Sequence, residues 1–293
     1  MCSTMTNDIS VIIYSYKGKL LKDVIQKLVN NSSNQSKVNI KVIDQHPLKR
    51  TETFEKELGC LYKHVFWDWQ ISPIRQKKAM LDSSTEKYTL FIADNIFIQQ
   101  DWDLELINFV KDSTNIVSGN AKVTIEKDGN FFIKKNYTAS SIFELTNWID
   151  RRFIFGKTST FVDRIIFPEY LKYNGEEEAM SLEFFTNNVN IFSAPSTMYH
   201  EIGKNTLDYL YAPFSLNHNY NSVIDLFKGG SNKFGSVLER PRSFDDFNLF
   251  HNDILNKLNK LPFQTNDVEY DPMDLNFNTV DARRFVARTK AIH

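Results

Sequence analysis

Residues 9–14 read Ile-Ser-Val-Ile-Ile-Tyr, and this run decides the fold class. Its β-branched residues follow one another without the alternation of polar residues that a strand with one solvent-exposed face shows, so they predict a strand buried in a parallel sheet. Apolar residues at helical spacing from Leu20 to Val29 predict a helix, and a second strand, 38–43, ends at Asp44. Together these elements predict a βαβ unit whose ligand-binding edge lies beyond the carboxyl ends of its strands.

The alternation of strands and helices continues along the chain to about residue 119. The sequence predicts, in order, a strand at 62–69, a helix at 73–81, a buried strand at 88–93, a helix at 101–110 and a strand at 116–119. A β-hairpin is expected over 123–133, so an α/β half with a parallel sheet is followed by an α+β middle.

The C-terminal part of the chain has a different composition. We place one domain at 1–225 and an extension at 226–293 that is expected to pack on it. The extension includes a predicted helix at 249–261 and ends in a basic tail around Arg283 to Lys290.

The composition is that of an ordinary globular protein without a dominant charge. Apolar residues make up 42% and charged residues 24%, and 35 basic against 36 acidic side chains give a formal charge of -1. This balance provides no long-range attraction to nucleic acid or to an anionic membrane. Cys2 and Cys60 are too few for a disulfide framework, and the sequence shows neither a signal peptide nor an apolar run of about 20 residues, so we expect a cytoplasmic protein.

Asp94 is the first candidate for chemistry, because it directly follows the predicted strand 88–93. A carboxylate at that edge of an α/β sheet can hold a divalent cation, which neutralises a departing diphosphate. Its neighbours are Ala93 and Asn95, so the triplet offers one carboxylate and one amide. The alternative is a loop aspartate that caps the following segment.

The other candidates are ambiguous when each is taken alone. His200 at a strand end could bind Mn²⁺, or it could be an ordinary surface or core hydrogen-bonding histidine. Glu176 and Glu177, after Gly175, could orient a sugar hydroxyl or could start a solvated helix. Arg75 at a helix start could bind a phosphate or sugar, or could be a surface cation.

Several nucleotide-binding and catalytic motifs are missing from the sequence. It contains no G-x-x-x-x-G-K-[ST], no G-x-G-x-x-G and no G-x-S-x-G. With only 10 glycines, the chain fits a metal-held diphosphate better than a glycine-cradled one.

Seven segments in order carry a family resemblance over roughly residues 9–255. They are 9–17, 72–75, 88–95 with Trp102-Asp103, 153–168, 175–177, 186–195 with His200, and 234–235 with 242–247. In this order they resemble the cytosolic N-acetylglucosaminyltransferases that modify hydroxyproline, which are relatives of the polypeptide N-acetylgalactosaminyltransferases. The chain departs from that family at Ala93 and Asn95 in the metal triplet, near Glu183 in place of an arginine, and at Asn187-Asn188 in place of x-Gly.

The resemblance implies an α/β fold of the GT-A type, a Rossmann-like nucleotide-diphospho-sugar transferase fold, with a C-terminal extension. It implies transfer of a sugar from a nucleotide-sugar donor, most naturally a UDP-sugar, to a hydroxyl with retained configuration. Mn²⁺ or Mg²⁺ would be held by Asp94 and His200 with help from Asn95. Residues near the donor would be Ser15, Tyr16, Lys17, Asp44 and Arg75, and the residues near the sugar or acceptor would be Glu176 and Glu177.

Three readings of the acceptor and activity follow. The family precedent suggests hydroxyproline in a protein. A hydroxymethylated base in DNA is a rival, for which the Arg283–Lys290 stretch would contact phosphates, although the charge of -1 argues against it. The third reading is a catalytically inactive GT-A fold that only binds a partner, which Ala93 and Asn95 motivate.

Overall fold

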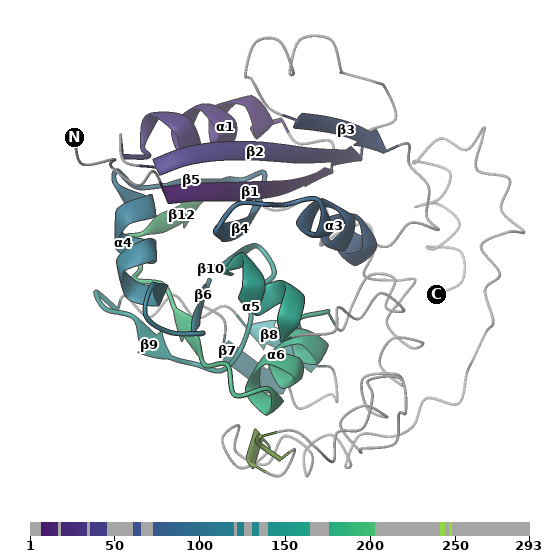
Figure 1. Ribbon diagram of the computed structural model, residues 1–293, viewed down its shortest axis with the longest axis vertical. Helices are drawn as coiled ribbons and strands as arrows, with labels where there is room; N and C mark the ends of the chain where they lie inside the picture. Colours follow the sequence, from purple (N-terminus) through teal and green to yellow (C-terminus); the bar gives the residue numbers. More distant parts are fainter. Residues whose placement is uncertain are drawn as a thin grey trace, which may run out of the picture.

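A mixed sheet of eight strands, in the order β3-β2-β1-β4-β10-β6-β11-β9, forms the centre of the protein (Figure 1). The computed structural model describes residues 7–16, 19–33, 36–45, 61–65, 73–119, 122–125, 131–134, 140–164, 176–202, 241–243 and 246–247. The strands of this sheet are β1 (Asn7–Tyr16), β2 (Ser36–Gln45), β3 (Leu61–Val65), β4 (Tyr88–Ala93), β6 (Ile116–Ser118), β9 (Glu144–Leu145), β10 (Phe153–Lys157) and β11 (Ile191–Ser193).

Two antiparallel strand pairs and five helices complete the described part of the chain. The pairs are β5 (Ile96–Ile98) with β12 (Tyr199–Glu201), and β7 (Lys122–Ile125) with β8 (Phe131–Lys134). The helices are α1 (Leu21–Asn30), α3 (Pro73–Asp82), α4 (Trp102–Val110), α5 (Thr158–Asp163) and α6 (Glu176–Thr186). Among the described residues, no helix is long and apolar enough to cross a membrane.

The local predictions for the first half of the chain are confirmed. β1, α1, β2, α3, β4, α4 and β6 lie within a few residues of their expected bounds, and β7 and β8 form the expected hairpin. β3 covers the first part of the strand expected at 62–69, whose remainder lies outside the described residues. The helix expected at 249–261 and the basic tail also lie outside them.

β1 pairs in parallel with a strand on each side. Its pairing with β2 sets Ser15 opposite Asp44, and its pairing with β4 sets Tyr14 opposite Ala93. The carboxyl ends of these three strands are therefore level, and the βαβ expectation is confirmed for β1, α1 and β2.

The expectation of a parallel sheet is wrong beyond β4. β10 lies between β4 and β6 and runs antiparallel to both, so β6 does not join β4 directly. Gly156 of β10 explains part of this close pairing, because a Cβ there would lie 2.9 Å from Cγ2 of Ile116 in β6. The contact leaves room for glycine alone without a shift of the neighbours.

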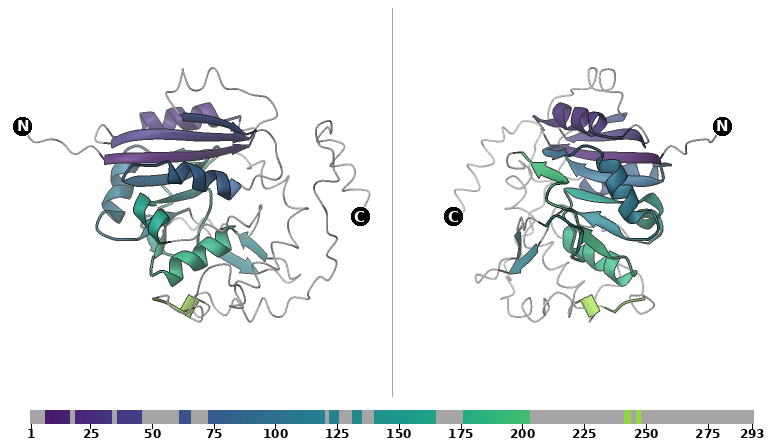
Figure 2. Two further views of the ribbon diagram at one scale, coloured as in Figure 1. Left: turned by 45° about the vertical axis from the view of Figure 1, so that its right-hand side comes forward. Right: turned by 90° about the vertical axis from the view of Figure 1, so that its left-hand side faces the viewer.

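Helices cover both faces of the sheet. Ile9, Val11 and Ile13 point to the face that carries α1 and α4, whereas Ile12 and Tyr14 pack in a second cluster with residues of α3, α5 and α6 (Figures 1 and 2). This alternation explains why the first run of the sequence is apolar on both sides.

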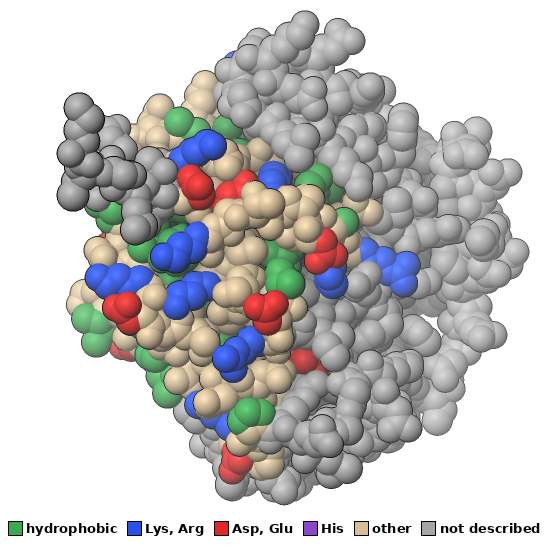
Figure 3. Space-filling model, viewed as in Figure 1, with side chains coloured by type: hydrophobic (Ala, Val, Ile, Leu, Met, Phe, Trp, Pro, Cys, Tyr) green, Lys and Arg blue, Asp and Glu red, His purple; other side chains and the backbone are tan. Residues whose placement is uncertain are grey.

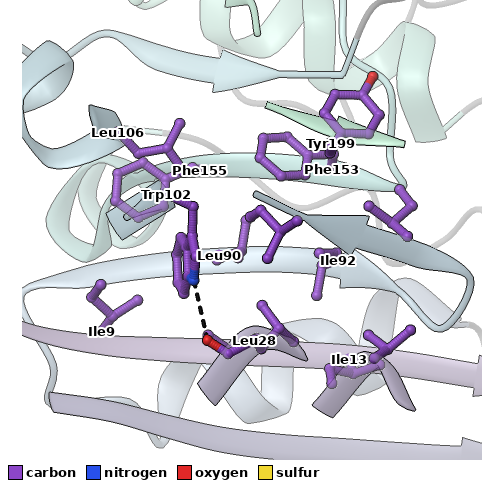
Figure 4. Packing of buried hydrophobic residues seen from close by; sticks show 14 of the residues in the cluster. Ile9, Ile13, Leu28, Leu90, Ile92, Trp102, Leu106, Phe153, Phe155 and Tyr199 are labelled. Carbon is purple, nitrogen blue, oxygen red and sulfur yellow. Dashed lines mark hydrogen bonds between the residues drawn. The ribbon is translucent and has the colours of Figure 1, made fainter. Parts of the chain in front are cut away.

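Trp102 joins α4 to α1 inside the larger cluster. Its side chain is buried beside Leu90 and Leu106, and Nε1 donates a hydrogen bond of 3.1 Å to the Leu28 carbonyl oxygen (Figure 4). The bond satisfies an indole donor that burial would otherwise leave unpaired. Its acceptor, the Leu28 carbonyl oxygen, belongs to the last turn of α1, where carbonyls lack partners within the helix.

Asn188 adopts a left-handed backbone conformation just after α6. The residue follows α6 with φ 59°, in the left-handed region that favours glycine, and its N–H bonds the Phe185 carbonyl oxygen at 3.0 Å. Asparagine tolerates this conformation better than most residues, so it can stand at a helix end where glycine is the commonest residue.

A segment near residue 247 packs against α6. The Phe247 side chain is 0% exposed. The centre of its ring lies 6.2 Å from that of the Trp148 ring and 5.3 Å from that of the Phe185 ring. Arg242 places its guanidinium 4.9 Å from the centre of the Phe185 ring, and its N–H donates to the Thr186 carbonyl oxygen at 3.2 Å.

We expect Phe247→Ala to lower the free energy of unfolding by about 3 kcal/mol, because it deletes a fully buried ring and leaves a cavity. Urea denaturation of the full chain measures this change. Val162→Ala, at a side chain that is half exposed, is the control and should cost well under 1 kcal/mol. Equal effects of the two substitutions would contradict the packing of Phe247.

Candidate functional site

The candidate site lies at the carboxyl ends of β1, β2 and β4. Ser15 and Asp44 are both buried there and are paired in register. Asp94 follows the last residue of β4, and it is buried together with Asn95. The structure therefore brings four of the predicted site residues to one sheet edge. Tyr16 ends β1 at the same edge, and Lys17 lies outside the described residues.

Asn95 is held by the returning strand β12. β12 pairs antiparallel with β5, and the N–H of Ile202 donates to the Asn95 carbonyl oxygen at 2.9 Å. The side-chain amide Nδ2 of Asn95 donates to Oε1 of Glu201 at 3.1 Å. Its amide oxygen Oδ1 is buried and has no hydrogen-bond partner among the described residues.

Arg152 is the counter-ion of Glu201. Its Nη1 donates to the same Glu201 Oε1, while Nε and Nη2 donate to Oδ1 and Oδ2 of Asp150 at 3.1 Å each. Burial alone would lower the pKa of Arg152, but the Asp150 and Glu201 carboxylates outweigh it and raise the pKa above its ordinary value. The backbone carbonyl of Arg152 also accepts from the Ala93 N–H at 2.8 Å, which places this buried charge beside the triplet.

Asp150 is fixed by the end of β6. Its N–H donates to the Ser118 hydroxyl at 2.6 Å. A Cβ at Gly119 would lie 2.8 Å from Oδ2 of Asp150, so only a glycine lets the two segments approach this closely. The sequence did not single out Asp150, Arg152 or Glu201. The one local signal was an Asp-Arg-Arg run directly before the apolar run 153–155.

Glu176 and Glu177 lie at the start of α6, where the helix dipole favours acidic side chains. Glu176 is buried, and its Oε1 lies 2.9 Å from Nζ of Lys77 in α3. Glu177 accepts a hydrogen bond of 2.9 Å from the Arg151 N–H, which ties α6 to the turn before β10. A helix does begin at these glutamates, as one of the two interpretations of the sequence predicted, but it is largely buried rather than solvated.

Glu178 has a raised pKa for a carboxyl group. It is partly buried, and burial together with the charge of Glu177 raises its pKa to about 7. A carboxyl with this pKa is protonated in a large fraction of molecules at neutral pH.

His200 and Arg75 are exposed in the structure. The His200 ring meets the Phe97 ring edge-on with centroids 5.7 Å apart, and strand alternation puts it on the side of β12 opposite to Glu201. The described residues contain no group of three or more His, Cys, Asp or Glu side chains placed to hold a metal ion. The roles expected for His200 and Arg75 stay predictions.

Comparison with known proteins identifies the fold. Searches against protein-family models and against curated protein sequences find no match. Among solved structures, the chain is similar to S. aureus TarS at 14% identity, with a TM-score of 0.58 over 85% of this chain and 43% of that one. It is also similar to GalNAc-T7 with UDP, GalNAc and Mn²⁺, at 11% identity and a TM-score of 0.59 over 87% of this chain and 58% of that one.

A third similar structure is TarS 1-349 in complex with UDP-GlcNAc, at 12% identity and a TM-score of 0.55 over 85% of this chain and 72% of that one. The chain thus spans about half the length of full TarS and of GalNAc-T7. At these identities the likeness establishes the fold alone: the chain has the GT-A fold of these glycosyltransferases, as predicted.

The raised pKa of Glu178 makes stability depend on pH. Between the ordinary pKa of 4.5 and about 7, the native protein keeps a proton that the unfolded chain has released. Stability from this group therefore falls as the pH rises through that window, and the loss is complete above it. We expect Glu178→Gln to unfold with a free energy on the order of 1 kcal/mol higher than wild type at pH 8, and with no difference at pH 4.

Thermal denaturation at pH 4, 6 and 8 checks this expectation. Glu144→Gln, at an exposed carboxyl of β9, is the control and should show no such window. A Glu178→Gln protein that follows the wild-type pH profile would refute the assignment.

Proposed function

We propose that the protein is a glycosyltransferase that moves a sugar from a nucleotide-sugar donor, most naturally a UDP-sugar, to a hydroxyl group. The observation that carries the proposal is the buried Asp94-Asn95 pair at the carboxyl end of β4, on the ligand-binding edge of a GT-A fold. Similar structures contain UDP-GlcNAc, UDP, or UDP with GalNAc and Mn²⁺, which supports the donor class.

The residues at this edge fit a hard divalent cation such as Mg²⁺ or Mn²⁺. Asp94 supplies a carboxylate, and Asn95 has a buried amide oxygen without a partner among the described residues. Oxygen ligands of this kind suit both ions, and phosphate and water oxygens would complete the shell. When bound, the cation would neutralise the diphosphate as it leaves. In this proposal His200, in β12, is a further ligand of the cation.

The donor-side roles follow from position on the sheet. Ser15 and Asp44 are the next-to-last residues of β1 and β2 and lie opposite each other, so they would orient the nucleoside beside the diphosphate. Tyr16, Lys17 and Arg75 are proposed to lie around the donor as well.

Glu176 and Glu177 are proposed for the sugar and acceptor side. In the structure Glu176 binds Lys77 and Glu177 binds the backbone N–H of Arg151. The Glu177 carboxylate thus holds the turn that precedes Arg152, whereas Glu176 ties α6 to α3. Glu177 would shape the site through that turn as well as through direct contact.

The proposed transfer retains the configuration at the anomeric carbon. The acceptor hydroxyl would attack on the face from which the diphosphate leaves, the bond from the anomeric carbon to the phosphate oxygen would break, and a phosphate oxygen would take the hydroxyl proton. No separate protein base is needed for this step. Fixed charges at the sheet edge would then supply much of the rate by stabilising the departing diphosphate.

For the acceptor we propose hydroxyproline in a protein, on the strength of the family resemblance. Basic and acidic side chains of the described residues are interspersed on the face seen in Figure 3, rather than gathered by sign. DNA binding depends on phosphate contacts from clustered basic residues. The formal charge of -1 also provides no long-range attraction to DNA, and on this ground we favour a protein acceptor over hydroxymethylated DNA.

A thermal-shift panel of UDP, GDP, CDP and their sugars, with and without Mn²⁺, tests the donor class. We expect a rise in Tm with UDP-sugars that depends on Mn²⁺. Asp94→Ala should abolish this rise and sugar transfer, with little change in the Tm of the free protein, because the residue follows the last strand position. Asp112→Ala, at an exposed site, is the matched control.

Absence of any shift would instead favour the inactive binding module. A strong loss of stability in Asp94→Ala with transfer intact would refute the site assignment.

His200→Ala tests the second metal residue. We expect it to weaken the apparent affinity for Mn²⁺ in the presence of UDP by about tenfold, without a change in Tm, since its side chain is exposed. Titration of Mn²⁺ with detection of the free ion measures the affinity. An unchanged titration would remove His200 from the site.

A further inference from the structure

We propose that Glu201 is a positioning residue that fixes the orientation of the Asn95 amide, so that the amide oxygen faces a divalent cation at the donor diphosphate. The inference rests on the proposed function, and it adds a residue that the sequence did not single out. It starts from the unpartnered, buried Oδ1 atom of Asn95.

The first step concerns which end of the amide meets Glu201. An asparagine side chain has a donating NH₂ and an accepting oxygen, whereas an ionised carboxylate can only accept. Oε1 of Glu201 receives hydrogen bonds from both Asn95 Nδ2 and Arg152 Nη1. Because this one oxygen accepts from both the guanidinium and the amide, the NH₂ faces Glu201 and the amide oxygen points away from it.

The second step concerns which partner would satisfy the buried oxygen Oδ1 of Asn95. Asn95 is only 6% exposed, and a buried acceptor without a hydrogen-bond partner destabilises the folded protein. A cation that binds this oxygen would remove that destabilisation. The adjacent Asp94 supplies a carboxylate, and a carboxylate beside an amide oxygen is a ligand pair for Mg²⁺ or Mn²⁺.

The third step is the rigidity of Glu201. Arg152 is held by the bidentate contact with Asp150, which in turn is anchored at the end of β6. Tyr199 precedes Glu201 by two residues on the same side of β12 and stacks on Phe153, with ring centroids 4.8 Å apart (Figure 4). Glu201 is therefore fixed by an ion pair at its head and by core packing of its strand.

Glu201→Gln tests the inference, because a glutamine can donate as well as accept and no longer dictates the amide orientation. We expect the affinity for Mn²⁺ in the presence of UDP, measured by electron paramagnetic resonance of the free ion, to fall about tenfold. Affinity for UDP without Mn²⁺, measured by calorimetry, should stay within about twofold. Glu144→Gln serves as the control and should change neither value.

A charge-conserving exchange supplies the decisive variant. In Glu201→Gln with Asn95→Asp, the introduced glutamine amide can donate to a carboxylate whose two oxygens are equivalent, so no orientation has to be imposed. We expect this double variant to bind Mn²⁺ with UDP at least as tightly as wild type.

Each outcome decides the inference. A folded Glu201→Gln protein with wild-type Mn²⁺ affinity would overturn it and leave the proposed function intact. A double variant that binds Mn²⁺ as weakly as Glu201→Gln would also overturn the inference. If Glu201→Gln alone does not fold, a double variant that binds no Mn²⁺ would overturn it. A wild-type protein that binds no UDP with Mn²⁺ would refute the proposed function itself.

Discussion

The parallel pairing of β1 with both β2 and β4 is the constraint on which the rest of the structure depends. Side chains of β1 are buried alternately under α1 with α4 and under α3, α5 and α6, so a shift of one residue would exchange two packed faces. The same register makes the carboxyl ends of the three strands level. Core packing thereby places Ser15, Asp44 and Asp94 at one edge.

Long-range antiparallel pairing then completes this edge. β10 carries Arg152 to the backbone of Ala93, and β12 carries Glu201 to the side chain of Asn95. Buried charges are tolerated where each has partners, and here two carboxylates share one guanidinium. The triplet therefore has one carboxylate, from Asp94, and one amide, from Asn95, which Glu201 holds in one orientation. This arrangement makes a cation-assisted diphosphate site chemically reasonable although Ala93 offers no ligand.

Sequence patterns predicted what is encoded locally. The strand 88–93 and the position of Asp94 at its end follow from a short apolar run and a polar stop, and both are found in the structure. The insertion of β10 and the pair of Arg152 with Glu201, 49 residues apart, follow from tertiary packing and leave no local pattern. The segment around His200 was identified from the sequence, but its neighbour Glu201, which contacts Asn95, was not.

The most direct test of the central claim is a crystal structure of the protein with UDP and Mn²⁺. The account predicts the diphosphate at the carboxyl ends of β1 and β4, with the cation bound by oxygens of Asp94 and Asn95 and with Glu201 still on the amide nitrogen. A nucleotide bound elsewhere on the protein, or a cation at this edge that contacts neither side chain, would contradict it.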